Sequence, residues 1–451
     1  MKRIDILPDD TLLEIFDFYV GDLWFQGKAR VEEWQSLVHA CRRWRILVLG
    51  SPRRLNLQLC CTPKTPARDT LHVWPALPLI VDGLMISSSG PDNVIASLGE
   101  SNRVCKVRLW FDAGWGLEEV LAAMQVPFPE LIYLELSLNG QTAPFIPDLF
   151  LNGSASRLQD FELHGIPFPG LPKLLLSATH LVKLRLENIS HSGYISPEAI
   201  VALISVLSSL ETLSLQFRSP QSRPDWETRR QPPSKRSVIP ALTLLRFRGV
   251  VEYLEDLVTC IDIPQLDNMR ITFFNQIDFD TPRLAQFINR TPELWKRDGF
   301  VQFYDDFVRV GLSPGTLIIE ISCREPDWQL SSIEQICNSS LRPLSTVEDL
   351  YIEHQYREIV WKHKAIENTL WLQLLLPFTA VKNLYLSMDF APGIAAALQE
   401  LVVARITEVL PSLQNIFVKG LEPSGAFQKN IGQFVDARQL SGHLIAISDW
   451  D

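Results

Sequence analysis

The chain has 451 residues, of which 46% are hydrophobic and 21% are charged, and 42 basic against 52 acidic residues give a net charge of -10 and a pI near 5.4. This composition predicts a globular protein with a large core, and the acidic balance argues against nucleic acid as a partner. The seven cysteines form no CxxC pair, which argues against a disulfide framework and a zinc site. Neither a membrane span nor a signal peptide is predicted, so we expect reduced thiols and a cytoplasmic or nuclear location.

The first predicted helix begins at "LPDDTLLEIF", residues 7–16. Pro8 suits the first helical position, and Asp9 and Asp10 place negative charge in the first turn. At helical spacing six apolar residues fill an arc of roughly 160°, which is wide for a short helix: Ile15, Tyr19, Leu12, Phe16, Val20 and Leu13. Another part of the chain, or another protein, is expected to cover this arc.

A second helix is predicted over 32–48, "EEWQSLVHACRRWRILV", because Trp34, Leu37, Val38, Cys41, Trp44 and Val48 recur at helical spacing. The following "RRLNLQLCC" (53–61) has the pattern of a strand. The proline-rich residues 61–81 then indicate an irregular connector.

One phrase, L-x-x-L-x-L with conservative exchanges, recurs along the rest of the chain. It begins at residues 131, 158, 181, 210, 242 and 266, at intervals of 27, 23, 29, 32 and 24, and again at 347, 381 and 413. Helical patterns such as 196–210, with Ser196 as N-cap, and 391–410 lie between the phrases. This period predicts strand–helix repeats that stack into an α/β solenoid with parallel strands on the concave side.

Two stretches interrupt the repeats. Residues 218–237 hold four prolines and six basic residues, which fits a solvated loop insertion or, alternatively, a nuclear-localisation or phosphate-binding segment. Residues 283–345 lack a clean phrase, although 300–310 and 315–322 resemble two neighbouring strands. The solenoid is expected to be irregular there or to carry a hairpin.

No nucleotide-binding, nucleophile-elbow or metalloprotease motif occurs, and the eight histidines are scattered. The acidic pairs Asp305-Asp306 and Asp278/Asp280 are more simply solvated residues than catalytic ones. We therefore expect a binding protein that is not an enzyme and that needs no cofactor and no metal.

The N-terminal segments resemble the F-box, whose pattern runs L-P-x-E-x-L-x-x-I-F and later V-x-x-V-C-x-x-W. Leu7, Pro8, Leu12, Ile15 and Phe16 match its first part, and Val38, Cys41 and Trp44 match its second part. Asp10 replaces the usual glutamate and Ala40 a usual valine, and the connection between the two parts is longer than usual. Together with residues 51–81, the strand at 346–354 and the end of the chain at 439–451, the sequence is similar to fungal F-box proteins with degenerate leucine-rich repeats.

This resemblance implies an F-box at 1–50, a connector at 51–100 leading into the solenoid, and a repeat domain at 101–451. The F-box would bind a Skp-type adaptor and through it a cullin, and the repeats would select an unknown protein substrate for ubiquitination. Leu7, Pro8, Leu12, Ile15, Phe16, Val38, Cys41 and Trp44 would form the adaptor surface. The alternatives are that some of these residues form only the core of the small helical unit, and that the protein acts as a scaffold or binding module outside a ligase.

The residue between the last two apolar positions of each phrase should point to the concave face. In chain order these residues are Glu135, Glu162, Arg185, Ser214, Arg246, Arg270, Tyr351, Tyr385 and Phe417. Interfaces are enriched in tyrosine, phenylalanine and arginine, whereas aromatic residues are also good strand formers. We predict Arg185, Arg246, Arg270, Tyr351, Tyr385 and Phe417 as candidate substrate-binding residues, with the arginines meeting an acidic or phosphorylated segment.

Overall fold

The computed structural model describes residues 7–20, 33–64, 66–86, 91–112, 114–140, 143–220, 236–339, 341–354, 367–401, 407–420 and 426–450. In this part the protein is mixed α/β, and most of its strands are parallel. The chain divides into two compact units, Met1–Tyr194 and Ile195–Asp451. This division falls at neither of the boundaries that the sequence predicts, near 50 and near 100. No helix in the described ranges is long and apolar enough to cross a membrane.

The first unit begins with three short helices and continues with a parallel sheet in the strand order β1-β2-β3-β4-β5-β6. Its helices are α1 (Asp9–Val20), α2 (Glu33–Ala40), α3 (Arg42–Gly50), α4 (Ala67–Val73), α5 (Pro91–Leu98), α6 (Leu117–Ala123) and α7 (Leu171–Leu175). Its strands are β1 (Leu59–Cys61), β2 (Leu79–Ile86), β3 (Val104–Asp112), β4 (Tyr133–Asn139), β5 (Asp160–His164) and β6 (Lys183–Ile189).

The second unit has a sheet in the order β7-β9-β11-β14-β13-β12-β15-β16-β17-β18, parallel except that β13 runs antiparallel to both of its neighbours. Its strands are β7 (Thr212–Phe217), β9 (Leu244–Gly249), β11 (Asn268–Phe273), β12 (Asp298–Phe303), β13 (Phe307–Ser313), β14 (Leu317–Ser322), β15 (Asp349–His354), β16 (Asn383–Leu386), β17 (Asn415–Val418) and β18 (Ala446–Asp449), with β8 (Ser237–Val238) and β10 (Ile261–Asp262) as a separate parallel pair. Its helices are α8 (Pro197–Ile204), α9 (Val251–Cys260), α10 (Pro282–Asn289), α11 (Pro326–Asn338), α12 (Asn368–Leu375), α13 (Ala391–Gln399) and α14 (Ala426–Leu440).

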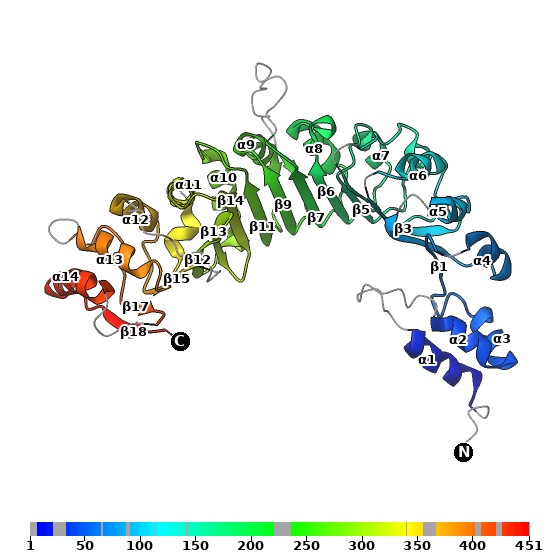
Figure 1. Ribbon diagram of the computed structural model, residues 1–451, viewed down its shortest axis with the longest axis horizontal. Coiled ribbons are helices and arrows are strands. Elements are labelled where there is room, and N and C mark those ends of the chain that lie inside the picture. Colours follow the sequence, from blue (N-terminus) through cyan, green and yellow to red (C-terminus); the bar gives the residue numbers. More distant parts are fainter. Residues whose placement is uncertain are drawn as a thin grey trace. The chain divides into compact units, whose positions relative to one another are not determined.

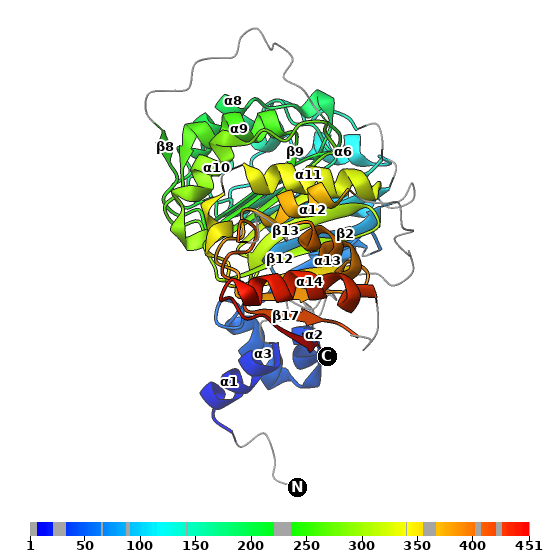
Figure 2. The ribbon, with the colours of Figure 1, turned by 90° about the vertical axis from the view of Figure 1, so that its left-hand side faces the viewer.

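In both units the helices that follow the strands lie along one face of the sheet, and no helix of the described residues lies on the other face (Figure 1). In the second unit α11, α12, α13 and α14 pack side by side as consecutive rows (Figure 2). The strands accordingly alternate between buried side chains under the helices and half-buried or exposed side chains opposite. We call the side without helices the open face.

Each of the nine repeat phrases forms a parallel strand, as predicted, and its three apolar positions are buried beneath the helices. Leu181, Leu184 and Leu186 on β6 and Leu210, Leu213 and Leu215 on β7 are all at most 4% exposed. Ser196 also caps α8 as predicted, because its Oγ accepts a hydrogen bond from the amide of Ala199 at 3.2 Å. Local periodicity therefore determines which side of each strand enters the core.

Replacing Leu184 or Leu213 by alanine should each lower the free energy of unfolding by ~2 to 5 kcal/mol, through lost burial and the cavity left behind. Urea denaturation followed by circular dichroism measures this loss. Leu176→Ala and Leu440→Ala are matched controls, since these leucines are 61% and 89% exposed. A Leu184→Lys or Leu213→Lys variant with unchanged stability would show that the strand register is wrong.

Several other predictions need correction. The helix predicted over 32–48 is broken at Cys41, which has extended φ and ψ of -159° and 169° and caps α3 by accepting from the amide of Trp44. The strand predicted at 53–61 is limited to β1, because residues 52–56 form turns. The connector predicted at 51–100 contains β1, α4, β2 and α5, so it is part of the first sheet.

The predicted interruptions have different outcomes. Residues 300–310, predicted as one strand, belong to two strands, β12 and β13, which form a hairpin with Asp305 and Asp306 exposed at its turn. Strand β13 also pairs with β14. This confirms the hairpin alternative. Most of the predicted loop insertion, residues 221–235, lies outside the described residues, while Ser237 already belongs to β8.

Candidate protein-binding surfaces

The N-terminal helices bury part of the predicted adaptor surface in their own core. Leu12, Phe16 and Val38 are at most 1% exposed, and the Phe16 ring packs edge-on against Trp44 with 4.8 Å between centroids. Trp44 and Leu7 are half-buried, whereas Pro8, Ile15 and Cys41 are exposed. Leu12, Phe16 and Val38 therefore belong to the core of the helical unit, which is the alternative given above. Another protein can contact Pro8, Ile15 and Cys41 directly.

A row of exposed apolar side chains remains on α1. Ile15, Phe18 and Tyr19 are 44%, 91% and 46% exposed, and their spacing of three and four residues puts them on one side of the helix. On α3, Ile46 is 62% exposed. The sequence analysis named Ile15 as a site residue but missed Phe18 and Ile46. A helical wheel would have shown that these two apolar residues lie outside the apolar side of their helices.

The start of α1 is held by an arginine from α3. The guanidinium of Arg43 donates to Asp9 Oδ1 at 2.5 and 3.1 Å and to the carbonyl of Leu7 at 2.7 Å. The Pro8 carbonyl accepts from the amide of Leu12, so the helix begins at Asp9, one residue after the predicted start. These bonds fix the segment before α1 and leave Pro8 accessible.

The open face of the first unit is a network of paired charges. One register row runs Asp82, Arg108, Glu135, Glu162 and Arg185 across β2 to β6. Arg108 donates to both carboxylate oxygens of Asp82 at 3.0 and 2.6 Å, and Arg185 donates to Glu162 at 2.7 Å. Arg185, a predicted substrate-binding residue, therefore already has a carboxylate partner.

Glu135, at the centre of this row, accepts hydrogen bonds from two aromatic side chains. The Trp110 indole N–H and the Tyr133 hydroxyl each donate to its carboxylate at 2.5 Å. Burial, together with the bond to Glu135, raises the pKa of Tyr133, so its hydroxyl stays protonated and acts as a donor. Burial also raises the pKa of Glu162, although the Arg185 charge opposes this shift. The carboxylates of Asp82, Glu135 and Glu162 thus each accept a hydrogen bond from a neighbouring side chain.

The second unit brings the predicted aromatic residues together. Tyr351, Tyr385 and Phe417 are in register on β15, β16 and β17, and their rings stack nearly parallel at 4.3 and 4.6 Å. Trp450, which follows β18, packs against Tyr351 and Tyr385 at 5.8 and 5.4 Å. Burial and the neighbouring Tyr385 raise the pKa of Tyr351 to about 12, so the Tyr351 phenol is neutral at physiological pH.

Arg246 and Arg270 lie in the same register row as the aromatic residues. Arg246 on β9 is paired with Arg270 on β11, which is paired with Ile318 on β14. Ile318 is in register with Gly311, and Gly311 with Phe300, which in turn is in register with Tyr351. We call the residues Arg246, Arg270, Ile318, Phe300, Tyr351, Tyr385 and Phe417 the open-face row.

Gly311 gives the open-face row an uninterrupted apolar middle. A Cβ at Gly311 would lie 2.4 Å from Cζ of Phe300, so the Phe300 ring occupies the space above this glycine. Phe300 and Trp450 were not predicted as site residues. The pairing of β12 with β15 puts Phe300 in the row, and such long-range pairing has no local sequence signal.

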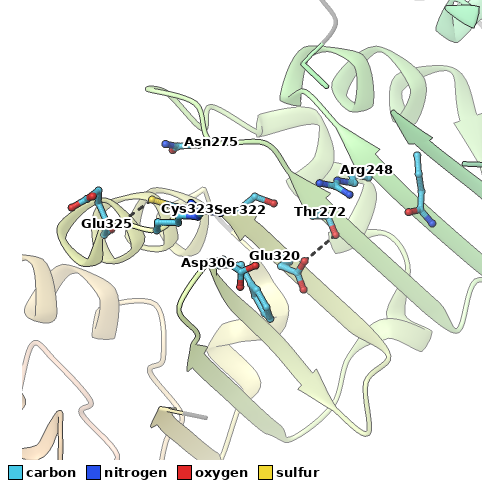
Figure 3. A pocket seen from close by; sticks show the side chains of 11 residues that line it. Arg248, Thr272, Asn275, Asp306, Glu320, Ser322, Cys323 and Glu325 are labelled. Atoms are coloured by element: carbon cyan, nitrogen blue, oxygen red, sulfur yellow. Dashed lines mark hydrogen bonds between the residues drawn. The ribbon is translucent and has the colours of Figure 1, made fainter. Parts of the chain in front are cut away.

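An open hollow of about 760 Å³ lies beside the arginine end of the row. Its lining residues include Arg248, Thr272, Asp306, Glu320, Cys323 and Glu325 (Figure 3). Thr272 donates to Glu320 at 3.4 Å, and burial raises the pKa of Glu320 although the charges of Arg309 and Arg248 oppose this. Burial also raises the pKa of Cys323, which keeps it a thiol. The hollow is therefore lined by both basic and acidic side chains, which can donate and accept hydrogen bonds.

Among the described residues, no three or more His, Cys, Asp or Glu side chains are grouped so that they could hold a metal ion. The chain was compared with protein-family models and with curated proteins, and none of either matched it. The surfaces described above are therefore the basis for assigning a function.

Proposed function

We propose that the protein is the substrate-recognition subunit of a Skp-cullin-F-box ubiquitin ligase. Residues 1–50 act as an F-box that binds a Skp-type adaptor, and the sheets act as a degenerate leucine-rich-repeat solenoid whose open face binds the target protein. The protein itself is not catalytic in this role, and it works in the cytoplasm or nucleus.

The observation that carries the proposal is the exposed apolar row on α1 within a segment that has the F-box pattern. Ile15, Phe18 and Tyr19 project from a helix whose other apolar side is filled by Leu12, Leu13 and Phe16. Exposed apolar side chains grouped on one helix mark a docking surface for another protein. Pro8 and Cys41, both exposed, belong to the same pattern.

The repeat architecture also supports the proposal. Strands β3 to β7, β9 and β11 each bury alternate apolar side chains on one side of a sheet. The helices or turns that come after these strands lie on that same side. Stacked units of this kind leave one long face free for a partner, while the helices are used for packing. The fixed adaptor and the variable target would thus use separate surfaces.

Replacing Ile15 and Phe18 by aspartate should weaken binding of a purified Skp-type adaptor by at least about tenfold, which corresponds to ~1.4 kcal/mol. Both side chains are exposed, so the fold should be unaffected. Glu14→Ala with Asp17→Ala is the matched control, since both acids are exposed on the same helix. Leu7→Ala with Pro8→Ala should also weaken binding, because these residues precede the helix.

Titration by isothermal calorimetry gives the affinities, and circular dichroism checks that each variant is folded. Unchanged affinity in a well-folded Ile15→Asp/Phe18→Asp variant would contradict the proposed F-box surface. Co-purification with a cullin from cells supports the ligase role. Binding of the adaptor without a cullin would favour the alternative function, a scaffold or binding module outside a ligase.

A further inference from the structure

A tryptophan from the edge of the second unit's sheet lies on the aromatic part of the open-face row. Trp450 follows β18, and β18 is three strand steps from β15 in the order β15-β16-β17-β18. Neighbouring strands are ~4.8 Å apart, so Tyr351 on β15 is about 14 Å from β18 across the sheet. The indole nevertheless packs 5.8 Å from the Tyr351 ring and 5.4 Å from the Tyr385 ring. The Trp450 side chain therefore reaches back over the sheet toward β15 and β16.

The stacking of the row leaves ring edges for this contact. Tyr351, Tyr385 and Phe417 stack with interplanar angles of 9° and 11°, so their edges rather than their faces point away from the sheet. The indole is inclined to the two tyrosines by 59° and 68°, an arrangement that is favourable between aromatic rings. The ammonium of Lys419, directly after β17, lies 5.6 Å from the centre of the indole. We call Tyr351, Tyr385 and Lys419 the indole site.

The strand that carries this tryptophan is weakly held. Ala446, Ser448 and Asp449 on β18 are exposed and Ile447 is half-buried, whereas β16 and β17 each bury two of their four residues. Among the described residues β18 pairs with β17 alone, at the edge of the sheet. Segments with few buried side chains open locally at a low cost in free energy. The indole site is therefore covered by an element that can open without unfolding the rest of the sheet.

The contacts of this segment define which side chains fit beside β17. Ile445 is buried, and Ile447 is in register with the buried Ile416, so these two isoleucines lie on the helix side of the sheet. The backbone amides of Ala446 and Trp450 donate to the carbonyls of residues 414 and 418 at 2.9 and 3.2 Å. An extended segment with an aliphatic residue, a second one two positions later and a tryptophan three positions after that can make all of these contacts.

We infer that the edge of β17 and the indole site bind an extended segment of a target protein with this aliphatic-x-aliphatic-x-x-tryptophan pattern. The segment pairs with β17 as a parallel strand, as in other cases of strand addition to a sheet edge, and its indole takes the place of Trp450. Residues 445–450 occupy the site until such a segment displaces them. This inference rests on the proposed target-binding role of the open face.

A target protein fits this site better than a second copy of the chain. Residues 445–450 are attached to their own sheet, so their effective concentration at the site is on the order of millimolar, and a free second copy at lower concentration does not replace them. A target that also contacts Phe300 and Ile318, which continue the open-face row beyond Tyr351, gains the same advantage from its second contact.

The experiment measures binding of a fluorescein-labelled peptide, HLIAISDW, to the 451-residue chain by fluorescence anisotropy; the peptide repeats residues 443–450. Trp450→Ala in the chain removes the indole from the site and should tighten binding at least about tenfold, because the affinity is reduced by the fraction of chains whose site is occupied. Ser448→Pro should tighten it as well, since residue 448 lies midway between the two amides that donate to the neighbouring strand and proline has no amide hydrogen. Ser448→Ala is its matched control.

Changes in the peptide and in the row test the pattern. A peptide with serine in place of tryptophan should bind at least about tenfold more weakly. The peptide HLIAISWD should be weakened as well, because a shift by one residue moves the indole to the other side of the strand. Tyr351→Ser with Tyr385→Ser, made in the Trp450→Ala chain, should weaken HLIAISDW by at least about tenfold. Tyr304→Ser is the matched control, since Tyr304 is half-buried and stacks on Phe307 at 4.0 Å outside the indole site.

Circular dichroism checks that each variant is folded. The inference is overturned if neither the Trp450→Ala nor the Ser448→Pro chain binds the peptide, if neither substitution raises the affinity, or if the serine-containing peptide binds equally well. A dimer of the unchanged chain in light scattering that Trp450→Ala abolishes would assign the site to a second copy instead. The same preparations are tested for adaptor binding. A chain that binds adaptor and cullin but not the peptide refutes this inference alone, and a chain that binds the peptide but no adaptor refutes only the ligase role.

Discussion

Replacing Trp34 by alanine should lower the free energy of unfolding of the first unit by about 3 to 5 kcal/mol. Trp34 on α2 is fully buried, and its ring packs edge-on against Trp74 at 5.0 Å. Its indole N–H donates to the carbonyl of Gln58, next to β1, at 3.0 Å. The substitution leaves a large cavity and a carbonyl without its donor, and it weakens the attachment of the N-terminal helices to the sheet.

Denaturation in urea monitored by circular dichroism, combined with limited proteolysis between α3 and β1, measures this effect. Trp34→Phe keeps most of the buried area but removes the N–H, so it should lose only about 1 to 3 kcal/mol. Trp115→Ala is the surface control, because Trp115 is 62% exposed, and it should change stability by less than about 0.5 kcal/mol. If Trp34→Ala were as stable as Trp115→Ala, Trp34 would not hold the helices to the sheet.

Replacing Arg438 by methionine should destabilise the second unit by about 3 to 5 kcal/mol. This arginine of α14 is fully buried, and its guanidinium donates to the carbonyls of Val409, Leu410 and Pro411 at 2.8, 3.0 and 3.3 Å. Burial lowers the pKa of Arg438, but the three carbonyls and the Phe434 ring, 5.2 Å away, stabilise the cation. Methionine fills a similar volume but donates to none of the three carbonyls, of which that of Leu410 also accepts from the amide of Leu413 at 3.1 Å.

The thermal midpoint and amide hydrogen exchange of residues 407–418 measure this loss. The neighbouring Gln439→Met is the matched control, since Gln439 is exposed on the same helix. Arg438→Lys should be intermediate, because an ammonium group cannot reach three carbonyls in the geometry of a guanidinium. Equal stability of the Arg438→Met and Gln439→Met variants would mean that the three carbonyls find other donors.

The strand phrases show what the sequence by itself determined. Leu213 and Leu215 alternate with residues of the open face, and this two-residue period depends only on backbone geometry. A strand that is buried on one side can therefore be predicted from a short stretch of sequence. The N-cap Ser196 is equally local, because its hydroxyl accepts from an amide of its own helix. The acidic first turn of α1 is local too, because its charge lies at the positive end of that helix's dipole. The aromatic row was predicted for the same reason, since Tyr351, Tyr385 and Phe417 occupy the same position of three successive phrases.

The tertiary structure decided what depends on partners distant in the sequence. The break between α2 and α3 at Cys41 could not be predicted from the sequence, because Trp34 and Val48 on its two sides still fit one helical period. The arrangement of α3 also involves a bond from Arg43 to Asp9, which is distant in the sequence. Arg185 forms an ion pair with Glu162, whereas Arg270 is in register with Arg246, although all three arginines occupy the same phrase position. Which side chain faces an arginine depends on strand order and register.

The same reason explains the middle of the open-face row. The hairpin of β12 and β13 lies between β14 and β15, so Phe300 covers Gly311 and joins Arg270 to Tyr351 in one row. Local periodicity predicted that strands exist there but not that β14 precedes β13 and β12 in the sheet. The sequence by itself determined the strands, their buried sides and the aromatic positions, because these follow from the backbone period. Only the tertiary structure decided the strand order, the charge pairing and the spacing of the open-face row, because these depend on contacts between residues far apart in the chain.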